Sequence, residues 1–286
     1  YDLKRMQAVI NVPVSDNFRM RFGVDDQERD GHLNNVSGIG PDDFANVDYT
    51  AFRVSAVLDV TENLENYTIF KTVESENNNT PGSLIACNLA GSFGSFCAAD
   101  LANRQAHGLD GFYDVWSNHP EPLSEIKSWQ GINTTTWEVN DNLTVKNILS
   151  YAEFENRNRN RIYGLNWQMP TGGGPREIVF AISDESDSGR KTGDSNTFVE
   201  EFQLQGTALD DHLTWQTGIY YEKTEPNQDY GSQSFALIAC DPSTYQAADP
   251  ADWRCNDVLG RGAELRFGLP PGSIHVGSEA TSPGGV

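Results

Sequence analysis

The stretch Asn11–Val24, NVPVSDNFRMRFGV, has alternating apolar residues on both sides of a short polar turn. The turn is Ser15-Asp16-Asn17, and the apolar residues around it are Val12, Val14, Phe18, Met20, Phe22 and Val24. Alternation with a period of two indicates β-strands, and Ser, Asp and Asn favour the turn between them. The stretch therefore predicts a β-hairpin, but it leaves open whether the apolar side meets a protein core or lipid.

The turn pattern recurs three times further along the chain. Its copies are VTENL at Val60–Leu64, VNDNL at Val139–Leu143 and a weaker LDDHL at Leu209–Leu213. Their unequal spacing argues against a solenoid or propeller of fixed period. The connections between hairpins are long, at about 25–48, 72–127, 155–196 and from 225 onward, and they hold all four cysteines. Short turns at one end and long loops at the other predict an up-and-down meander, as in outer-membrane barrels.

Composition excludes several classes of protein. The net charge of −21 over 286 residues argues against nucleic-acid binding, which needs an excess of lysine and arginine. No apolar run approaches the ~20 residues of a transmembrane helix, a test that does not bear on strands. Aromatic residues at the strand ends suit an interfacial girdle: Trp137, Tyr151, Trp215, Tyr220 and Tyr221.

The cysteines form two local pairs, Cys87 with Cys97 and Cys240 with Cys255. Neither pair has the short spacing of a zinc site, and both lie in regions rich in Gly, Ser, Asn, Asp and Pro. Two disulfides that close loops in an oxidising compartment are the favoured interpretation, with free thiols in a cytosolic protein as the alternative.

The sequence offers little for catalysis. Five scattered histidines lack metal-binding spacing, and neither a nucleophile elbow nor a phosphate-binding loop is found. We therefore expect a protein that is not an enzyme, with no catalytic residues, no metal site and no cofactor. Two alternatives stay open: a passive porin or adhesin barrel, and a soluble all-β carbohydrate-active enzyme with two carboxylates across a cleft.

Four strand segments, in order, resemble the barrel of TonB-dependent outer-membrane receptors. They are AVINVPVSDNFRMRFGVDDQERDGHLNN (Ala8–Asn35), FRVSAVLDVTENLE (Phe52–Glu65), TWEVNDNLTVKNILSYAEF (Thr136–Phe154) and EEFQLQGTALDDHLTWQTGIYYEKTEP (Glu200–Pro226). The resemblance implies a plug domain, a TonB box and a barrel of about 22 strands. This chain shows about eight strands and neither plug nor TonB box. We therefore expect residues 1–286 to be one partial barrel domain, a fragment without the plug and the C-terminal strands.

The resemblance also implies a function and a location. Such receptors lie in the outer membrane of Gram-negative bacteria and take up a scarce nutrient, often a ferric siderophore or similar chelate, by energised transport. The implied partners are the chelate, the receptor's own plug, the TonB energy-coupling complex and outer-membrane lipid.

Six polar residues are expected to face the lumen and contact the plug or the ligand: Arg19, Arg21, Arg53, Glu201, Gln203 and Gln205. Arginine suits anionic chelates because it forms charge-assisted hydrogen bonds. The loops around the two cysteine pairs are the candidates for ligand capture. The strands near 64–73 and 129–139 do not alternate cleanly, and the sequence leaves their faces unassigned.

Overall fold

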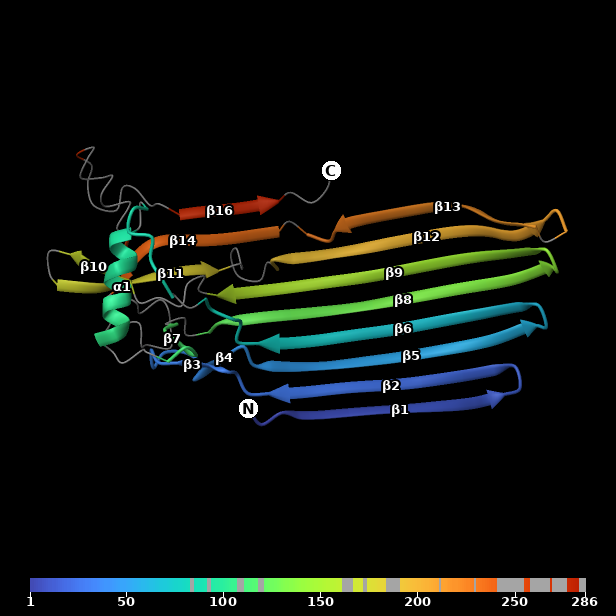
Figure 1. The fold of residues 1–286 in the computed structure, drawn as a ribbon, viewed down its shortest axis with the longest axis horizontal. Coiled ribbons are helices and arrows are strands. Elements are labelled where there is room, and N and C mark those ends of the chain that lie inside the picture. Colours follow the sequence, from blue (N-terminus) through green and yellow to red (C-terminus); the bar gives the residue numbers. More distant parts are fainter. Residues whose placement is uncertain are drawn as a thin grey trace.

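The computed structural model describes residues 1–82, 85–91, 94–106, 111–117, 121–160, 167–171, 174–183, 191–210, 212–228, 230–240, 255–257, 268 and 277–282. Eight long strands form an antiparallel meander in which each strand pairs with the next (Figure 1). Their bounds are β1 (Lys4–Ser15), β2 (Phe18–Arg29), β5 (Val47–Thr61), β6 (Leu64–Asn77), β8 (Leu123–Asn140), β9 (Leu143–Asn160), β12 (Gly193–Ala208) and β13 (Leu213–Pro226). The predicted fold class is confirmed: the chain is a mainly β, up-and-down antiparallel sheet.

The other elements gather at the end opposite the hairpin turns (Figure 1). The large sheet continues there with β10 (Trp167–Thr171), β11 (Gly174–Ser183), β14 (Tyr230–Cys240), β15 (Cys255–Asp257) and β16 (Gly277–Ser282). A small sheet has the order β4-β3-β7, from β3 (Leu33–Asn35), β4 (Asp43–Phe44) and β7 (Asp114–Val115). The helix α1 (Gly94–Ala106) lies in the connection from β6 to β8, where the sequence analysis expected only a loop. No helix in the described part of the chain is long and apolar enough to cross a membrane, a finding that does not bear on strands.

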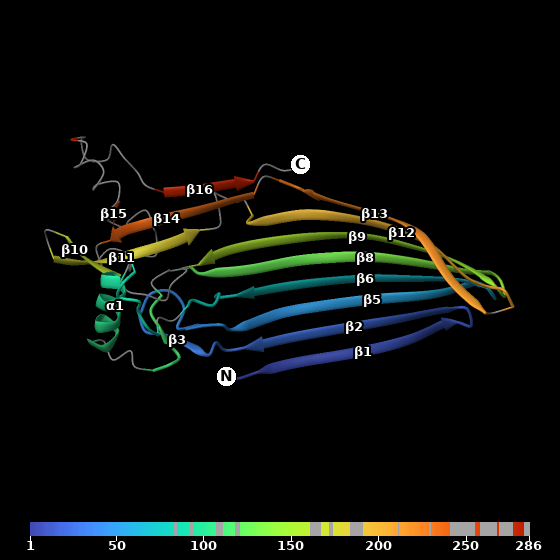
Figure 2. The ribbon, with the colours of Figure 1, turned by 45° about the horizontal axis from the view of Figure 1, so that its top comes forward.

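The hairpin turns explain the sequence repeat. In three hairpins the strand register shifts at the residue just before the turn, so that Val14, Val60 and Val139 are skipped. Such a β-bulge bends the strand and strengthens its twist, and the sheet is visibly twisted (Figure 2). The turn asparagines then join consecutive hairpins, because Asn17 Nδ2 donates to the Asp59 carbonyl at 3.4 Å and Asn63 Nδ2 to the Glu138 carbonyl at 3.0 Å. The repeated Asn is therefore a link between hairpins as well as a turn residue.

The strands are longer than the alternation predicted. β2 continues to Arg29, β6 to Asn77 and β9 to Asn160, although loops were expected from about residues 25, 72 and 155. The expected bounds were wrong because these upper parts carry polar residues on both faces. Backbone pairing continues there without an apolar signal, for example between Glu28 and Asp48.

The strands of the meander have almost no core of their own. Among the described residues the buried apolar side chains are Ile39, Phe44, Val115 and Leu123, all at the loop end. Large apolar side chains on the strands are instead exposed: Met6, Ile10, Phe52, Leu58, Phe70, Trp137, Leu149, Phe202 and Ile219. A water-soluble sheet buries such residues, whereas a lipid-facing sheet presents them.

Candidate functional site

Strand register places the six predicted lumen residues on one face of the sheet. Residues directly opposite each other in neighbouring strands share a face, and every second residue along a strand returns to it. One such row runs from Arg19 through Val57, Tyr67, Thr134 and Ile148 to Glu201. The same face carries Arg21, Arg53, Gln203 and Gln205, and we call it the polar face.

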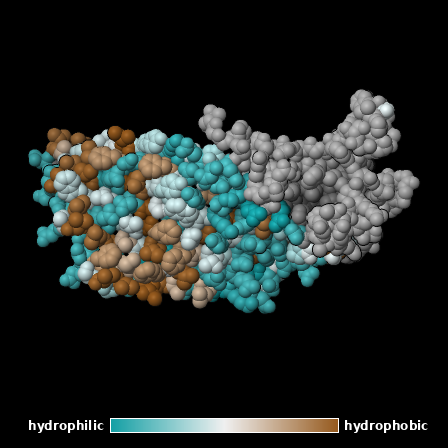
Figure 3. All heavy atoms as spheres, turned by 180° about the vertical axis from the view of Figure 1, so that it is seen from behind, coloured by the Kyte–Doolittle hydropathy of each residue, from teal (hydrophilic) through white to brown (hydrophobic). Residues whose placement is uncertain are grey.

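The opposite face, which we call the apolar face, carries the exposed hydrophobic residues. One row consists of Ile10, Phe22, Val54, Phe70, Gly131, Tyr151 and Phe198. Register thereby assigns the two strands that the sequence left open, β6 and β8. Phe70 and its partner Gly131 belong to the apolar face, whereas Ile69 and its partner Ile132 belong to the polar face. In the view of Figure 3, hydrophobic residues spread over the strand halves away from the loops, and hydrophilic residues gather where the strands approach them.

Aromatic rings mark the loop-side border of the apolar face. Trp129 lies 6.0 Å from Phe70 and 5.4 Å from Tyr151, measured between ring centroids. Both Trp129 Nε1 and Tyr151 Oη donate to Glu153, at 2.9 and 3.0 Å. Rings with one apolar and one hydrogen-bonded end suit a membrane–water border. Of the predicted girdle residues, Tyr220 does not belong here, because it pairs with Glu201 on the polar face.

The three predicted arginines differ in their partners. Arg19 is held by Asp59 through two hydrogen bonds, at 2.7 and 3.0 Å, close to the hairpin turns. The guanidinium of Arg19 is therefore already engaged by a bidentate partner within the chain. Arg53 donates to Tyr67 Oη at 3.2 Å, and Arg21 has neither an ion pair nor a side-chain hydrogen bond within the described residues. Arg21 and Arg53 therefore remain available for an external anion.

The sequence analysis missed a third available cation, Lys71. It lies directly opposite Arg53 in the pairing of β5 with β6, and among the described residues it has no carboxylate partner. Like charges directly opposite in a sheet destabilise the pairing. Lys71 escaped notice because Tyr67, Ile69 and Phe70 put apolar residues on both faces of β6 and obscured the alternation. Arg53 and Lys71 thus form a cation pair that an anion would stabilise.

The polar face is hollowed around these cations. A hollow of about 690 Å³ is lined by Arg53, Lys71, Asp25, Gln130 and neighbouring residues, and a second of about 540 Å³ nearer the turns contains Arg21. In the first hollow Asp25 is already paired with Arg5, whose nitrogens lie 2.9 and 2.7 Å from its carboxylate. The positive charge of Arg53 and Lys71 is therefore not neutralised by the acid beside them.

Glu201, Gln203 and Gln205 form a ladder along β12 rather than part of the cation hollow. Gln205 Nε2 donates to Gln203 Oε1 at 2.7 Å, and Gln203 Nε2 donates to Glu201 Oε1 at 2.5 Å. Each amide is thus oriented by the next, and the ladder ends on a carboxylate. It can offer hydrogen bonds to a polar surface lying against the wall.

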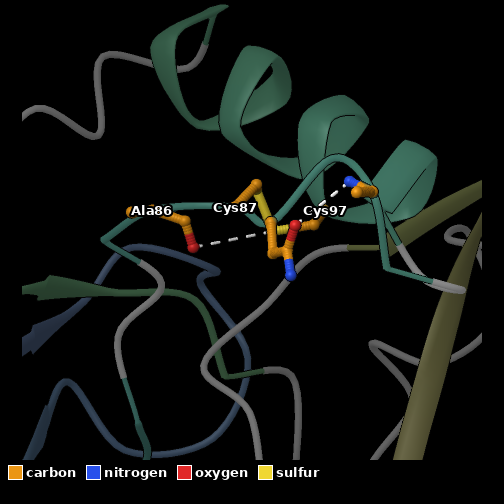
Figure 4. Close-up of a disulfide and its surroundings, with 5 residues drawn as sticks. Ala86, Cys87 and Cys97 are labelled. Carbon is orange, nitrogen blue, oxygen red and sulfur yellow. Dashed lines mark hydrogen bonds between the residues drawn. A yellow bond between two sulfur atoms is a disulfide. The ribbon is translucent and has the colours of Figure 1, made fainter.

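The loop end contains a disulfide and a second pair of neighbouring cysteines. A disulfide joins Cys87 to Cys97, which lies in the first turns of α1 (Figure 4). Cys240 and Cys255 are directly opposite each other in the β14–β15 pairing, while their side chains lie outside the described part of the structure. Cys87 and Cys97 therefore fix the start of α1 to the segment that precedes it.

A buried carboxylate ties the upper parts of β8 and β9 together. Glu125, which is 8% exposed, contacts Lys127 Nζ and lies 3.3 Å from Arg157 Nη1. The hydrogen bond from Lys127, reinforced by the charge of Arg157, holds the pKa of Glu125 below its usual range. This network lies on the apolar-face side, above the aromatic border.

Comparison with solved structures identifies the fold. The siderophore receptor PiuA from Acinetobacter baumannii matches with a TM-score of 0.51 and 12% identity, over 98% of this chain and 36% of the receptor. The chain shares the fold of a siderophore receptor. It therefore spans about a third of the length of that receptor.

Two further receptors align with lower TM-scores. They are the ferric-catecholate import receptor Fiu from E. coli (0.43, 11% identity, 99% of this chain and 44% of that chain) and the ferric yersiniabactin uptake receptor FyuA from Yersinia pestis (0.40, 11%, 82% and 44%). Neither a family model nor a curated protein matches the sequence. The predicted resemblance to TonB-dependent receptors is confirmed at the level of the fold by the match to PiuA.

Proposed function

We propose that the chain is part of the barrel of an outer-membrane receptor that takes up a ferric siderophore or similar chelate by energised transport. The observation that carries this proposal is the two-sided sheet, with exposed apolar residues on one face and uncompensated cations on the other. In a barrel of this fold, the apolar face meets lipid and the polar face lines the lumen. Residues 1–286 then form a partial barrel domain, and a plug and further strands belong to the complete receptor.

Within this receptor, Arg53, Lys71 and Arg21 contact an anionic surface in the lumen. Carboxylates of the plug and the anionic groups of a passing chelate share the same chemistry, since both accept charge-assisted hydrogen bonds. Arg19 supports the wall through Asp59, and the ladder of Glu201, Gln203 and Gln205 contacts polar groups of the plug. The barrel binds and conducts its ligand and makes or breaks no bond, so it requires no cofactor.

Uptake by the complete receptor tests this proposal. In a bacterium that lacks its own copy of the gene, we expect the receptor to fractionate with the outer membrane and to import a labelled ferric chelate. Import should stop when the proton gradient of the inner membrane is collapsed. Uptake that continues without the gradient would instead support a passive porin, and recovery of the complete protein as a soluble monomer would exclude a barrel.

The double substitution Arg53→Met with Lys71→Met tests the cation hollow. Hydrogen bonds to charged groups contribute about 1.5–3 kcal/mol, so the double variant should weaken chelate binding or uptake at least tenfold. Lys4→Met is the matched control, because Lys4 is an exposed cation on the apolar face, paired with Glu28. Equal uptake by both variants would show that the hollow does not contact an anion.

A further inference from the structure

Two charged residues lie within the apolar face below the aromatic border: Glu200, and Lys223 on the neighbouring strand β13, which is paired with Glu225 at 2.7 Å. Glu200 is exposed and stands on β12 between Phe198 and Phe202, which are apolar-face residues at two-residue steps on either side. Its contact is a hydrogen bond from Asn147 at 3.5 Å, and the described residues give it no ion pair. A carboxylate in the middle of a lipid-facing surface is costly, and such residues are usually paired with a partner.

A group of amide and hydroxyl side chains lies on the same face, on β8 and β6, which are two and three strands away from β12. We call it the amide patch, and it consists of Asn66, Thr68, Asn133 and Thr135. The two asparagines bond each other in both directions, at 3.0 and 2.9 Å, and each also donates to a threonine, at 2.9 and 2.8 Å. The hydroxyl of Thr135 donates only over 3.4 Å, to Asn133. Thr135 is therefore the member of the patch best able to turn its proton toward another acceptor.

Leu149 separates the acid from the amide patch. Asn133, Leu149 and Glu200 are consecutive register partners in β8, β9 and β12, so they lie in one row across the apolar face. An acceptor and a set of donors thus flank one apolar side chain, which is itself 40% exposed. A surface that carries both halves of a contact, on opposite sides of one point, is complementary to itself under a two-fold rotation.

We propose that the apolar face around Leu149 is an interface with a second copy of the same receptor, in which each Glu200 accepts hydrogen bonds from the other copy's amide patch. A two-fold axis along the membrane normal beside Leu149 brings β12 of one copy against β8 of the other. Between helices in a membrane, polar side chains and close packing drive association, and the same chemistry applies between barrel walls. The inference rests on the proposed function, since Glu200 needs such a partner only where the sheet faces lipid.

Cysteine cross-linking of the complete receptor in its native outer membrane tests the interface. Leu149→Cys should give a product of twice the receptor's mass under mild oxidation, which a reducing agent converts back to the single chain. Met20→Cys is the matched control, because Met20 lies in the same row of the apolar face but four strands away, on β2. A Leu149→Cys receptor that stays monomeric, or that links to a protein of another mass, would overturn the proposal.

Two further substitutions show whether the polar groups hold the copies together. In the Leu149→Cys receptor, Glu200→Met and Thr135→Val should each lower the cross-linked fraction, because a hydrogen bond of about 1 kcal/mol corresponds to about a fivefold change in association. Undiminished cross-linking in both variants would assign the contact to apolar packing and refute the pairing. A receptor that reaches the outer membrane and imports chelate, but is monomeric there, refutes the interface alone. A receptor that neither reaches the membrane nor imports chelate refutes the proposed function.

Discussion

The two faces of the sheet are formed by the same strands but carry opposite kinds of side chain. The apolar face leaves large hydrophobic side chains exposed and keeps its charges above the aromatic border, apart from Glu200 and Lys223. The polar face combines satisfied pairs, such as Arg19 with Asp59, with cations that have no acid partner. One alternating pattern therefore encodes both surfaces, and under the proposed function the partner of each surface lies outside this chain. Substitutions at neighbouring positions can therefore separate the roles of the two faces.

The largest difference is expected between Met20 and Arg21, adjacent residues on opposite faces. In a complete receptor folded into a bilayer, Met20→Arg should cost about 2–4 kcal/mol, because it places a cation against lipid near the midplane. Arg21→Ala should leave stability almost unchanged, since Arg21 makes no side-chain hydrogen bond or ion pair in the described residues. Reversible urea unfolding in liposomes measures both variants, and the opposite ranking would reverse the assignment of the faces.

A smaller effect is expected at the loop end of the apolar face, above the aromatic border, where the strands carry charged residues. Glu125→Gln removes the negative charge shared by Lys127 and Arg157 and should cost about 1 kcal/mol. Because the pKa of Glu125 is lowered in the folded state, its contribution is present above the usual pKa of a glutamate and is lost as the pH falls through the folded value.

Thermal unfolding across this acidic range checks the role of Glu125. The wild-type protein should lose more stability on acidification than Glu125→Gln, whose side chain does not titrate. Parallel curves for the two proteins would show that the network does not contribute to the pH dependence.

The smallest effect is expected within the polar face. Arg19→Met breaks a pair whose side chains are both partly exposed, so solvent screening limits the loss. The midpoint of urea unfolding should fall slightly, and Asp59→Asn should lower it by a similar amount. The double variant should be no worse than either single one, whereas additive losses would indicate that Arg19 and Asp59 act independently.

The sequence predicted the hairpins well because their signal is local. Ser15-Asp16-Asn17 and its copies define the turns, and alternation assigns Arg19, Arg21 and Met20 to faces without coordinates. The upper strands, the helix α1 and Lys71 were missed for a different reason. β2 beyond Val24 reads DDQER, with no apolar periodicity, and pairing with β5 alone keeps it extended. Lys71 becomes visible only when register places it opposite Arg53.

The hairpin turns and the loops have unequal freedom to change during evolution. The connection over residues 78–122, from β6 to β8, is roughly two and a half times as long as that over 30–46, from β2 to β5. The entropy of closing a flexible loop grows only with the logarithm of its length, so this difference costs less than about 1 kcal/mol. By contrast, inserting one residue beside Asn17 or Asn63 would disturb the links between hairpins. The loop end of such a sheet can therefore be rebuilt almost freely, while the turn end preserves the register of the whole wall.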